Sequence, residues 1–164
     1  MELPARKPNR LPEYDYSVPG AYFITICTQN RACIFWDAVG ASIARPQTLP
    51  LSKWGMIADT AIRNIPHHYP AVSVDTYVIM PNHIHLLLQI HTDADGRPLV
   101  APTISTVVQQ LKGVITKQIG RSIWQKLFHD HIIRNEQDYL KIWEYIENNP
   151  ARWEEDCFYE ETLL

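Results

Sequence analysis

His83 and His85 are the residues whose types and spacing first suggest chemistry, because they flank one apolar residue. The apolar residues on both sides of the pair predict a β-strand at this point. Successive side chains of a strand alternate between its faces, so residues i and i+2 point the same way and both imidazoles can converge on one metal ion. Two histidines that only form ordinary hydrogen bonds at a strand end are the structural alternative.

Two imidazoles alone make an incomplete metal site, and Tyr145 and Asn149 offer groups that would extend it. They lie four residues apart in a predicted helix, so they share one helical face. Asn149 would complete the metal shell, and Tyr145 would act beside it as a nucleophile on a metal-polarised phosphate. The alternative for Tyr145 is a half-buried aromatic of an amphipathic helix. Tyr139, six residues earlier, points to a different side, so only one of the two tyrosines can join Asn149.

The elements that must position these residues follow from apolar periodicity and turn signals. They are a strand over 22–28, a helix over 51–65 that Pro66 stops, a hairpin over 72–90 turning at Pro81-Asn82, a helix from Thr103 or Ser105 to Ile119, an extended segment over 122–134, and a helix from Asn135 to Asn149. This order predicts an α+β fold, an antiparallel sheet with helices packed on it, of the ferredoxin-like kind.

The length of 164 residues predicts a single domain over 1–164, with an N-terminal arm over 1–20 and an acidic tail over 151–164. The three cysteines have no metal-site spacing and imply no disulfide framework. No stretch approaches the roughly 18 apolar residues that a membrane span needs. We therefore expect a soluble, cytoplasmic protein without a membrane partner.

Charge is unevenly distributed, although the net charge is only −3. The segment from Arg97 to Arg134 carries six basic residues against one acid, whereas five acids and one arginine follow Ala151. A basic middle with an acidic tail is compatible with phosphate binding. A solvated helix face explains the same pattern equally well.

Several separate blocks of the sequence, in the same order, resemble the REP-associated tyrosine transposases, which belong to the wider single-tyrosine HUH transposases of insertion sequences. The blocks cover 11–17, 20–25, 77–85, 124–125, 130–131, 133–134 and 145–150. The resemblance therefore extends over nearly the whole chain, and it implies the HUH endonuclease version of the ferredoxin-like fold.

The resemblance also implies a reaction: cleavage and rejoining of hairpin-forming single-stranded DNA through a 5′-phosphotyrosine and a free 3′-hydroxyl. The residues that match the family pattern are His83 and His85 as metal ligands, Tyr145 as the nucleophile, and Asn149 as a further ligand where insertion-sequence relatives often carry glutamine. Mg²⁺ or Mn²⁺ would be the cofactor. The protein would act as a monomer or a homodimer.

Further residues are candidates for contact with DNA, through positive charge, hydrogen bonding or an aromatic face. They are Arg6, Lys7, Arg10, Lys112, Lys117, Arg121, Trp124, Lys126, His131 and Arg134. Each has a structural alternative, which for Trp124 is packing in the core. A second His-x-His pair, at His129 and His131, is ranked below the first because it does not match the family's metal motif.

Two other functions stay open from the sequence. One is a catalytically idle protein that binds single-stranded DNA hairpins, although His83, His85, Tyr145 and Asn149 are all intact. The other is a metal-dependent phosphodiesterase that uses water as its nucleophile. Covalent trapping of the tyrosine separates the second from a tyrosine transposase.

Overall fold

A four-stranded antiparallel sheet is the centre of the computed structural model, which describes residues 14–37, 51–97 and 102–156. The strands are β1 (Gly20–Cys27), β2 (Val72–Ile79), β3 (His83–Ile90) and β4 (His129–Ile133). They pair in the order β2-β3-β1-β4, which leaves β2 and β4 at the edges. This is the strand order of the ferredoxin-like fold, so the predicted fold class is confirmed.

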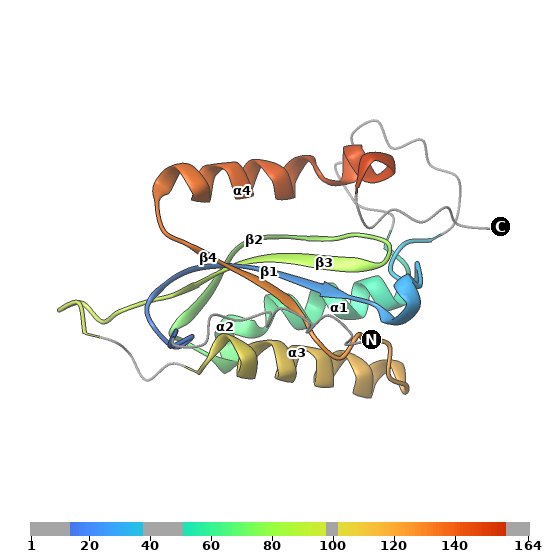
Figure 1. Cartoon of the computed structure of the whole chain (residues 1–164). Coiled ribbons are helices and arrows are strands. Elements are labelled where there is room, and N and C mark those ends of the chain that lie inside the picture. The colour runs from blue at the N-terminus through green and yellow to red at the C-terminus, as the bar shows by residue number, and fades with distance from the viewer. Residues whose placement is uncertain (1–13, 38–50, 98–101, 157–164) are drawn as a thin grey trace, which may run out of the picture.

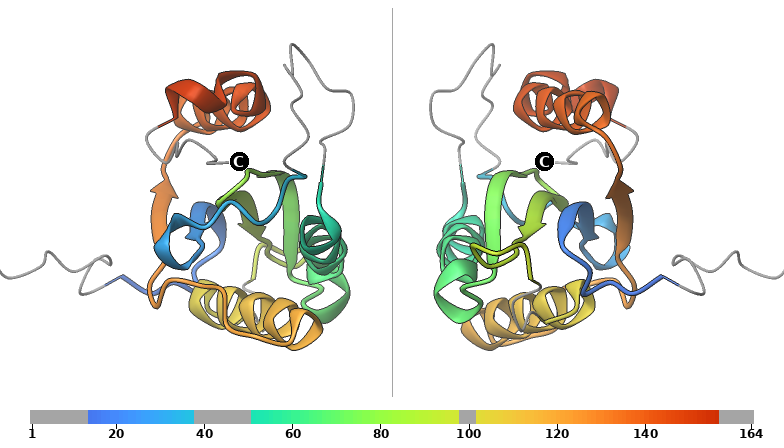
Figure 2. Two further views of the ribbon diagram at one scale, coloured as in Figure 1. Left: turned by 90° about the vertical axis from the view of Figure 1, so that its right-hand side faces the viewer. Right: turned by 90° about the vertical axis from the view of Figure 1, so that its left-hand side faces the viewer.

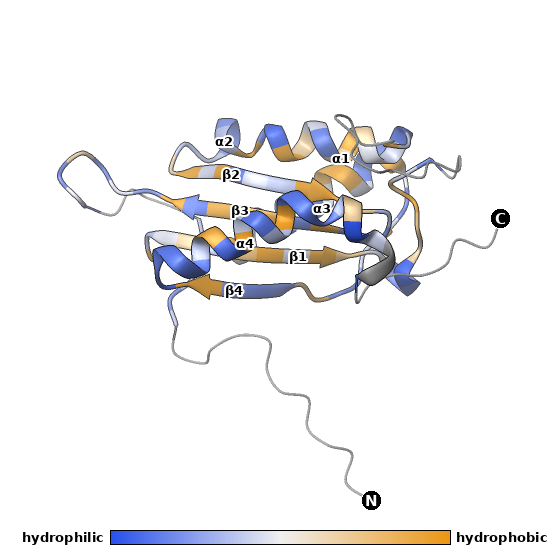
Figure 3. Ribbon diagram, turned by 90° about the horizontal axis from the view of Figure 1, so that it is seen from above, coloured by the Kyte–Doolittle hydropathy of each residue, from blue (hydrophilic) through white to orange (hydrophobic). Residues whose placement is uncertain are grey.

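The helices cover the two faces of this sheet unequally (Figures 1 and 2). One face carries α1 (Lys53–Arg63), the short α2 (Ile65–His68) and α3 (Ile104–Ile119), and the other carries α4 (Glu136–Asn148). Two 3₁₀ turns, η1 (Gln29–Arg31) and η2 (Pro150–Glu155), follow β1 and α4. Seen from above, α4 lies over the central strands and carries both hydrophilic and hydrophobic residues (Figure 3).

Alternation along β3 assigns its residues to two different environments. Ile84, Leu86, Leu88 and Ile90 belong to the large core between the sheet and α1 and α3. His83, His85 and Leu87 point to the α4 side, where Leu87 joins a smaller apolar cluster with Ile146 of α4. Because both faces are covered, the histidines are buried even though they lie outside the main core.

Local signals set most helix ends as predicted. Thr103 caps α3 by accepting from the backbone of Thr106, and Gly120 ends it with a φ of 91°, a left-handed conformation that glycine adopts without strain. Asn135 caps α4 in the same way as Thr103 caps α3.

One boundary prediction was wrong. Pro66 does not stop a helix but sits in the first turn of α2, where a missing N–H costs no hydrogen bond. The first residues of the predicted acidic tail belong to η2, which continues directly from α4, and residues 157–164 lie outside the described residues. Among the described helices, none combines the length and apolar character needed to cross a bilayer.

Candidate active site

The two histidines of β3 meet on the α4 side of the sheet, as their spacing predicts. Their Nε2 atoms lie 3.1 Å apart, and the two side chains are 0% and 1% exposed. Two metal–nitrogen bonds of about 2.1 Å can span up to about 4.2 Å, so one ion can contact both imidazoles. The alternation of the strand therefore brings together the pair that a metal site needs.

The other ring nitrogen of each histidine is held by a buried polar side chain. Nδ1 of His83 lies 2.8 Å from the amide oxygen of Asn82, and Nδ1 of His85 lies 2.8 Å from the hydroxyl of Thr25 on β1. When each Nδ1 carries the proton and donates it, each Nε2 presents a lone pair. Such partners fix the ring orientation and tautomer of metal-binding histidines.

Burial also keeps both imidazoles uncharged. It lowers the pKa of His83 to about 2, with a smaller contribution from the neighbouring His85. Burial lowers the pKa of His85 to about 3. The neutral imidazole is the form that binds a metal ion, so the pair needs no deprotonation at neutral pH.

Two oxygen donors lie in the segment that covers this pair. The Asn149 side chain is 3% exposed, and its Oδ1 accepts no hydrogen bond from any described residue. Asp156, just after η2, places a carboxylate oxygen 3.7 Å from Nε2 of His83. Ligand atoms of His83, His85 and Asp156 all lie within 4.8 Å of one another.

These donors fit a divalent metal ion. A buried amide oxygen without a partner is costly unless something binds it, and a cation would. Two neutral nitrogens with amide and carboxylate oxygens form a mixed set that suits a hard or borderline divalent ion. His83, His85 and Asn149, with Asp156 in reach, are therefore the residues that would hold it.

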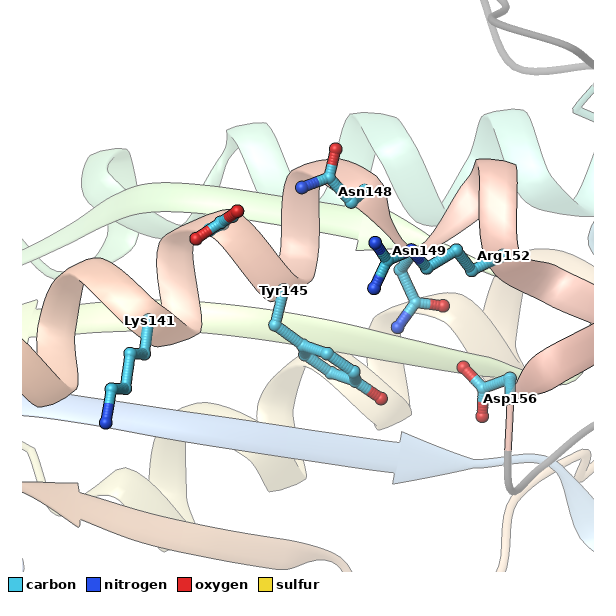
Figure 4. Close-up of a pocket in the computed structure, with 7 residues that line it drawn as sticks. Lys141, Tyr145, Asn148, Asn149, Arg152 and Asp156 are labelled. Atoms are coloured by element: carbon cyan, nitrogen blue, oxygen red, sulfur yellow. The ribbon is translucent and has the colours of Figure 1, made fainter.

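Tyr145 of α4 faces the same place from above. Its ring lies 5.3 Å from that of His85 and 6.1 Å from that of Phe23, centroid to centroid, and the residue is 43% exposed. Figure 4 shows Tyr145 and Asn149 on one side of the helix, with Asp156 below its end. The aromatic contacts orient the ring, and the exposure leaves room for a substrate.

Tyr139 is engaged elsewhere. Its hydroxyl donates to Asp75 of β2 at 2.7 Å. Burial, followed by this hydrogen bond, raises the pKa of Tyr139 to about 12. The helix therefore directs Tyr139 away from the histidines, in line with the prediction that only one tyrosine can join Asn149.

An open cavity of about 400 Å³ extends along α4 beside Tyr145, Asn149 and Asp156. Its lining comes from one side of α4 and from η2 and the residue that follows it: Lys141, Glu144, Tyr145, Asn148, Asn149, Arg152 and Asp156. This polar cavity combines a phenol, an amide oxygen that accepts no hydrogen bond from the described residues, two cations and two carboxylates. With a divalent ion held beside the carboxylates, it can accommodate a phosphodiester.

Burial argues against a DNA-stacking role for Trp124. The residue is 8% exposed, its ring packs on Phe35, and its indole N–H donates to the carbonyl of Lys112. Lys112 itself donates to the carbonyl of Gln125, and burial lowers its pKa. Both side chains belong to the packing between α3 and the sheet, on the face away from the histidines.

The other predicted DNA contacts are dispersed. Lys117 and Arg121 are exposed at the C-terminal end of α3, where the Arg121 guanidinium lies 4.7 Å from the Trp54 ring centroid. Lys126 and Arg134 are exposed before and after β4. His131 lies on this edge strand and contacts Asp138 at 2.7 Å. Arg6, Lys7 and Arg10 lie outside the described residues.

Several residues of the site were missed from the sequence. Asp156 was counted as part of an acidic tail, and Lys141 and Arg152 were not considered. Helical spacing from Tyr145 could have indicated Lys141, which lies one turn earlier. Nothing in the local pattern indicates Thr25, because its contact with His85 depends on the pairing of β1 with β3.

Comparison with known proteins identifies the family. No family model matches the chain. An uncharacterized protein of Haemophilus influenzae is 35% identical over 94% of this chain and 93% of its own length. A protein of Escherichia coli named REP-associated tyrosine transposase is 29% identical over 84% of this chain and 70% of its own length. A second Haemophilus influenzae protein that carries this family name is 25% identical over 84% of this chain. The chain belongs to the REP-associated tyrosine transposase family.

The fold agrees with this family. A solved REP-associated tyrosine transposase bound to a REP hairpin superposes with a TM-score of 0.60 at 22% identity. The match covers 87% of this chain and 74% of that structure. Members named in this way are transposases, so the chain is of a DNA-processing class.

Proposed function

We propose that this member of the REP-associated tyrosine transposase family is a metal-dependent endonuclease and strand-transfer enzyme for hairpin-forming single-stranded DNA. The observation that carries the proposal is that Tyr145 and Asn149 line one cavity with Asp156, directly beside the His83–His85 pair. The Asp156 carboxylate lies 3.7 Å from Nε2 of His83, and the Tyr145 ring lies 5.3 Å from the His85 ring. The related transposase solved with a REP hairpin supports the class of DNA. Mg²⁺ or Mn²⁺ is the proposed cofactor.

The proposed reaction is a transesterification. The Tyr145 oxygen attacks the scissile phosphorus, the new O–P bond forms, and the bond between phosphorus and the 3′-oxygen breaks. The phenol loses a proton and the leaving 3′-oxygen gains one, so no external energy source is needed. The 5′-phosphotyrosine keeps the energy of the original phosphodiester, and a 3′-hydroxyl can reverse the step to join strands.

Each residue of the site has a separate task in this proposal. His83, His85 and Asn149 hold the metal ion, with Asp156 as a further oxygen donor. When bound, the ion polarises the phosphate and stabilises the charge that develops on it. Phe23 and His85 orient the Tyr145 ring, and Asn82 and Thr25 orient the two imidazoles.

Covalent trapping tests the proposal. The protein is incubated with Mn²⁺ or Mg²⁺ and 3′-labelled single-stranded hairpins taken from around its own gene, and the products are separated on a denaturing gel. We expect a metal-dependent protein–DNA adduct that disappears in Tyr145→Phe and persists in Tyr139→Phe, the matched control on the same helix.

Other outcomes would favour the alternatives. Cleavage without an adduct, retained in Tyr145→Phe, would indicate a phosphodiesterase that uses water. Binding of a cognate hairpin without cleavage in either metal would indicate a catalytically idle DNA-binding protein. Either result contradicts the tyrosine mechanism.

A further inference from the structure

Two cations lie on either side of Tyr145 along the cavity, and the proposed function assigns no role to either of them. Lys141 lies four residues before Tyr145, and Arg152 lies seven residues after it in η2. At 1.5 Å per helical residue, Lys141 lies about 6 Å before Tyr145 along the α4 axis. Arg152 lies beyond the end of α4 at Asn148, in η2, where its own φ and ψ are not helical. Figure 4 shows both side chains at the cavity that Tyr145 enters.

Both cations are available for a ligand. Lys141 and Arg152 are exposed, and within the described part of the chain neither forms an ion pair. The carboxylates that share the cavity are Glu144 and Asp156, and Asp156 is directed to His83. When a divalent ion is held there, positive charge exceeds negative charge in the cavity. Asn148 adds amide donors to the same lining.

We infer that the exposed side of α4 and η2 is the binding surface for the backbone of the single strand. Lys141 and Arg152 bind phosphates on opposite sides of the one that Tyr145 attacks. The stretch from Lys141 to Asn148, the end of α4, spans about 10 Å, roughly three times the rise of about 3.4 Å per nucleotide in a stacked strand, and Arg152 follows in η2. The two cations therefore contact different phosphates, and the scissile phosphate lies between them. This inference rests on the proposed function and adds the path of the strand.

This binding surface is separate from the basic residues around α3. Lys117 belongs to α3, which covers the opposite face of the sheet from α4, and Arg121 follows α3 and lies against Trp54 of α1. A strand that passes Tyr145 follows α4, so the α4 cations set its position at the nucleophile. A positively charged groove that tracks the backbone is the usual way to bind a single strand without reading its sequence.

Binding measurements without cleavage test the inference. The parent is Tyr145→Phe, which cannot form the adduct, at one constant Mn²⁺ concentration. The probes are an unstructured 12-nucleotide strand and a blunt-ended hairpin, both fluorescently labelled. Anisotropy titrations over a series of salt concentrations compare the parent with Lys141→Gln/Arg152→Gln. The matched control is Lys53→Gln/Arg97→Gln, which removes two exposed cations outside the cavity. Circular dichroism melting checks that all variants fold.

We expect the α4 double variant to bind the single strand more weakly at low salt. Its slope of log affinity against log salt should fall by about 1.4, because each phosphate contact on a single strand contributes about 0.7. Binding of the blunt hairpin should change little, the control should keep the parental slope for the strand, and Lys141→Arg/Arg152→Lys should restore it. An unchanged slope in the α4 double variant, or an equal fall in the control, overturns the inference.

The same titration separates this inference from the proposed function. If the parent does not bind the single strand at all, both fail. If the parent binds the strand but the α4 double variant binds it equally well, only the path along α4 fails. If the slope falls as expected but no adduct forms with the wild-type protein and metal, the surface stands and the tyrosine mechanism fails.

Discussion

The two faces of the sheet differ in what they bury. The face under α1 and α3 buries an extensive, almost wholly apolar cluster that includes Ile24, Leu86 and Leu88. The face under α4 has a small apolar cluster around Leu87 and Ile146, next to the buried polar pair His83 and His85. The same strands serve both faces, because alternate residues point to opposite sides. Neighbouring residues of β3 therefore have different tasks: one set packs in the apolar core, and the other forms the candidate site.

The polar face is tolerable because its buried groups have partners. His85 is held by Thr25, and His83 by Asn82. Asn149 Oδ1, which accepts no hydrogen bond from the described residues, is the costly member. We therefore expect substitutions on the α4 face to change metal binding and substitutions on the face under α1 and α3 to change folding stability.

The largest effect is expected for His85→Gln. The substitution removes one Nε2 ligand, so Mn²⁺ binding should be lost and the rate of adduct formation should fall by roughly 100- to 1000-fold, about 3 to 4 kcal/mol in activation free energy. Calorimetric titration with Mn²⁺ and single-turnover adduct assays measure the two quantities. Unchanged Mn²⁺ affinity would remove His85 from the metal site.

Leu86→Ala, one residue further along β3, should do the opposite. Leu86 is fully buried in the large core, so its truncation should lower the free energy of unfolding by roughly 2 to 5 kcal/mol. The Mn²⁺ affinity of the folded protein should stay the same. Urea denaturation and Mn²⁺ titration check both values, and a tenfold loss of Mn²⁺ affinity would show that the faces are coupled.

Thr25→Val tests how the histidine is oriented. The substitution preserves shape but removes the hydroxyl that contacts Nδ1 of His85, so Mn²⁺ affinity should fall by about 10- to 100-fold. Ile24→Val is the matched control, since Ile24 is the preceding β-branched residue and belongs to the large core. Equal Mn²⁺ affinity in the two variants would exclude an orienting role for Thr25.

Acid should destabilise the metal-free protein through the α4 face. Unfolded histidines have a pKa of about 6.5, whereas burial lowers the pKa of His83 to about 2 and that of His85 to about 3. Between these limits the unfolded chain binds more protons, so stability is complete above about pH 6.5 and falls as the pH decreases.

Urea denaturation in EDTA at pH 7, 6, 5 and 4 measures this loss. Each of His83→Gln and His85→Gln should reduce the slope of unfolding free energy against pH by at most about 1.4 kcal/mol per pH unit. His67→Gln, which changes an exposed histidine of α2, is the control. If both His83→Gln and His85→Gln kept the parental pH dependence, the burial of these two histidines would not be the cause of the acid destabilisation.

The smallest effects are expected at the helix caps. Asn135→Ala on α4 and Thr103→Ala on α3 each remove one capping hydrogen bond, and each should lower the free energy of unfolding by about 1 kcal/mol. Only Asn135→Ala should also slow adduct formation, because α4 carries Tyr145. Equal adduct rates in the two variants would show that the cap does not affect the position of the tyrosine.

Much of the fold could be predicted because its signals are local. The alternation of β3, the Pro81-Asn82 turn, the Thr103 and Asn135 caps and the Gly120 terminus act within a few residues of the structure that they specify. Pro66 was misinterpreted because proline is unfavourable inside a helix but acceptable in its first turn, and the sequence does not distinguish a stop from a restart.

The sequence by itself determined the pairing of His83 with His85 and of Tyr145 with Asn149, because both depend on the fixed periods of a strand and a helix. Only the tertiary structure decided that α4 and not α3 covers the histidines, that Thr25, 60 residues from His85 in sequence, orients its ring, and that Asp156 lies beside His83. It also decided that Trp124 is buried in packing. Periodicity specifies which residues share a face, but strand register and helix packing between distant segments determine what that face meets.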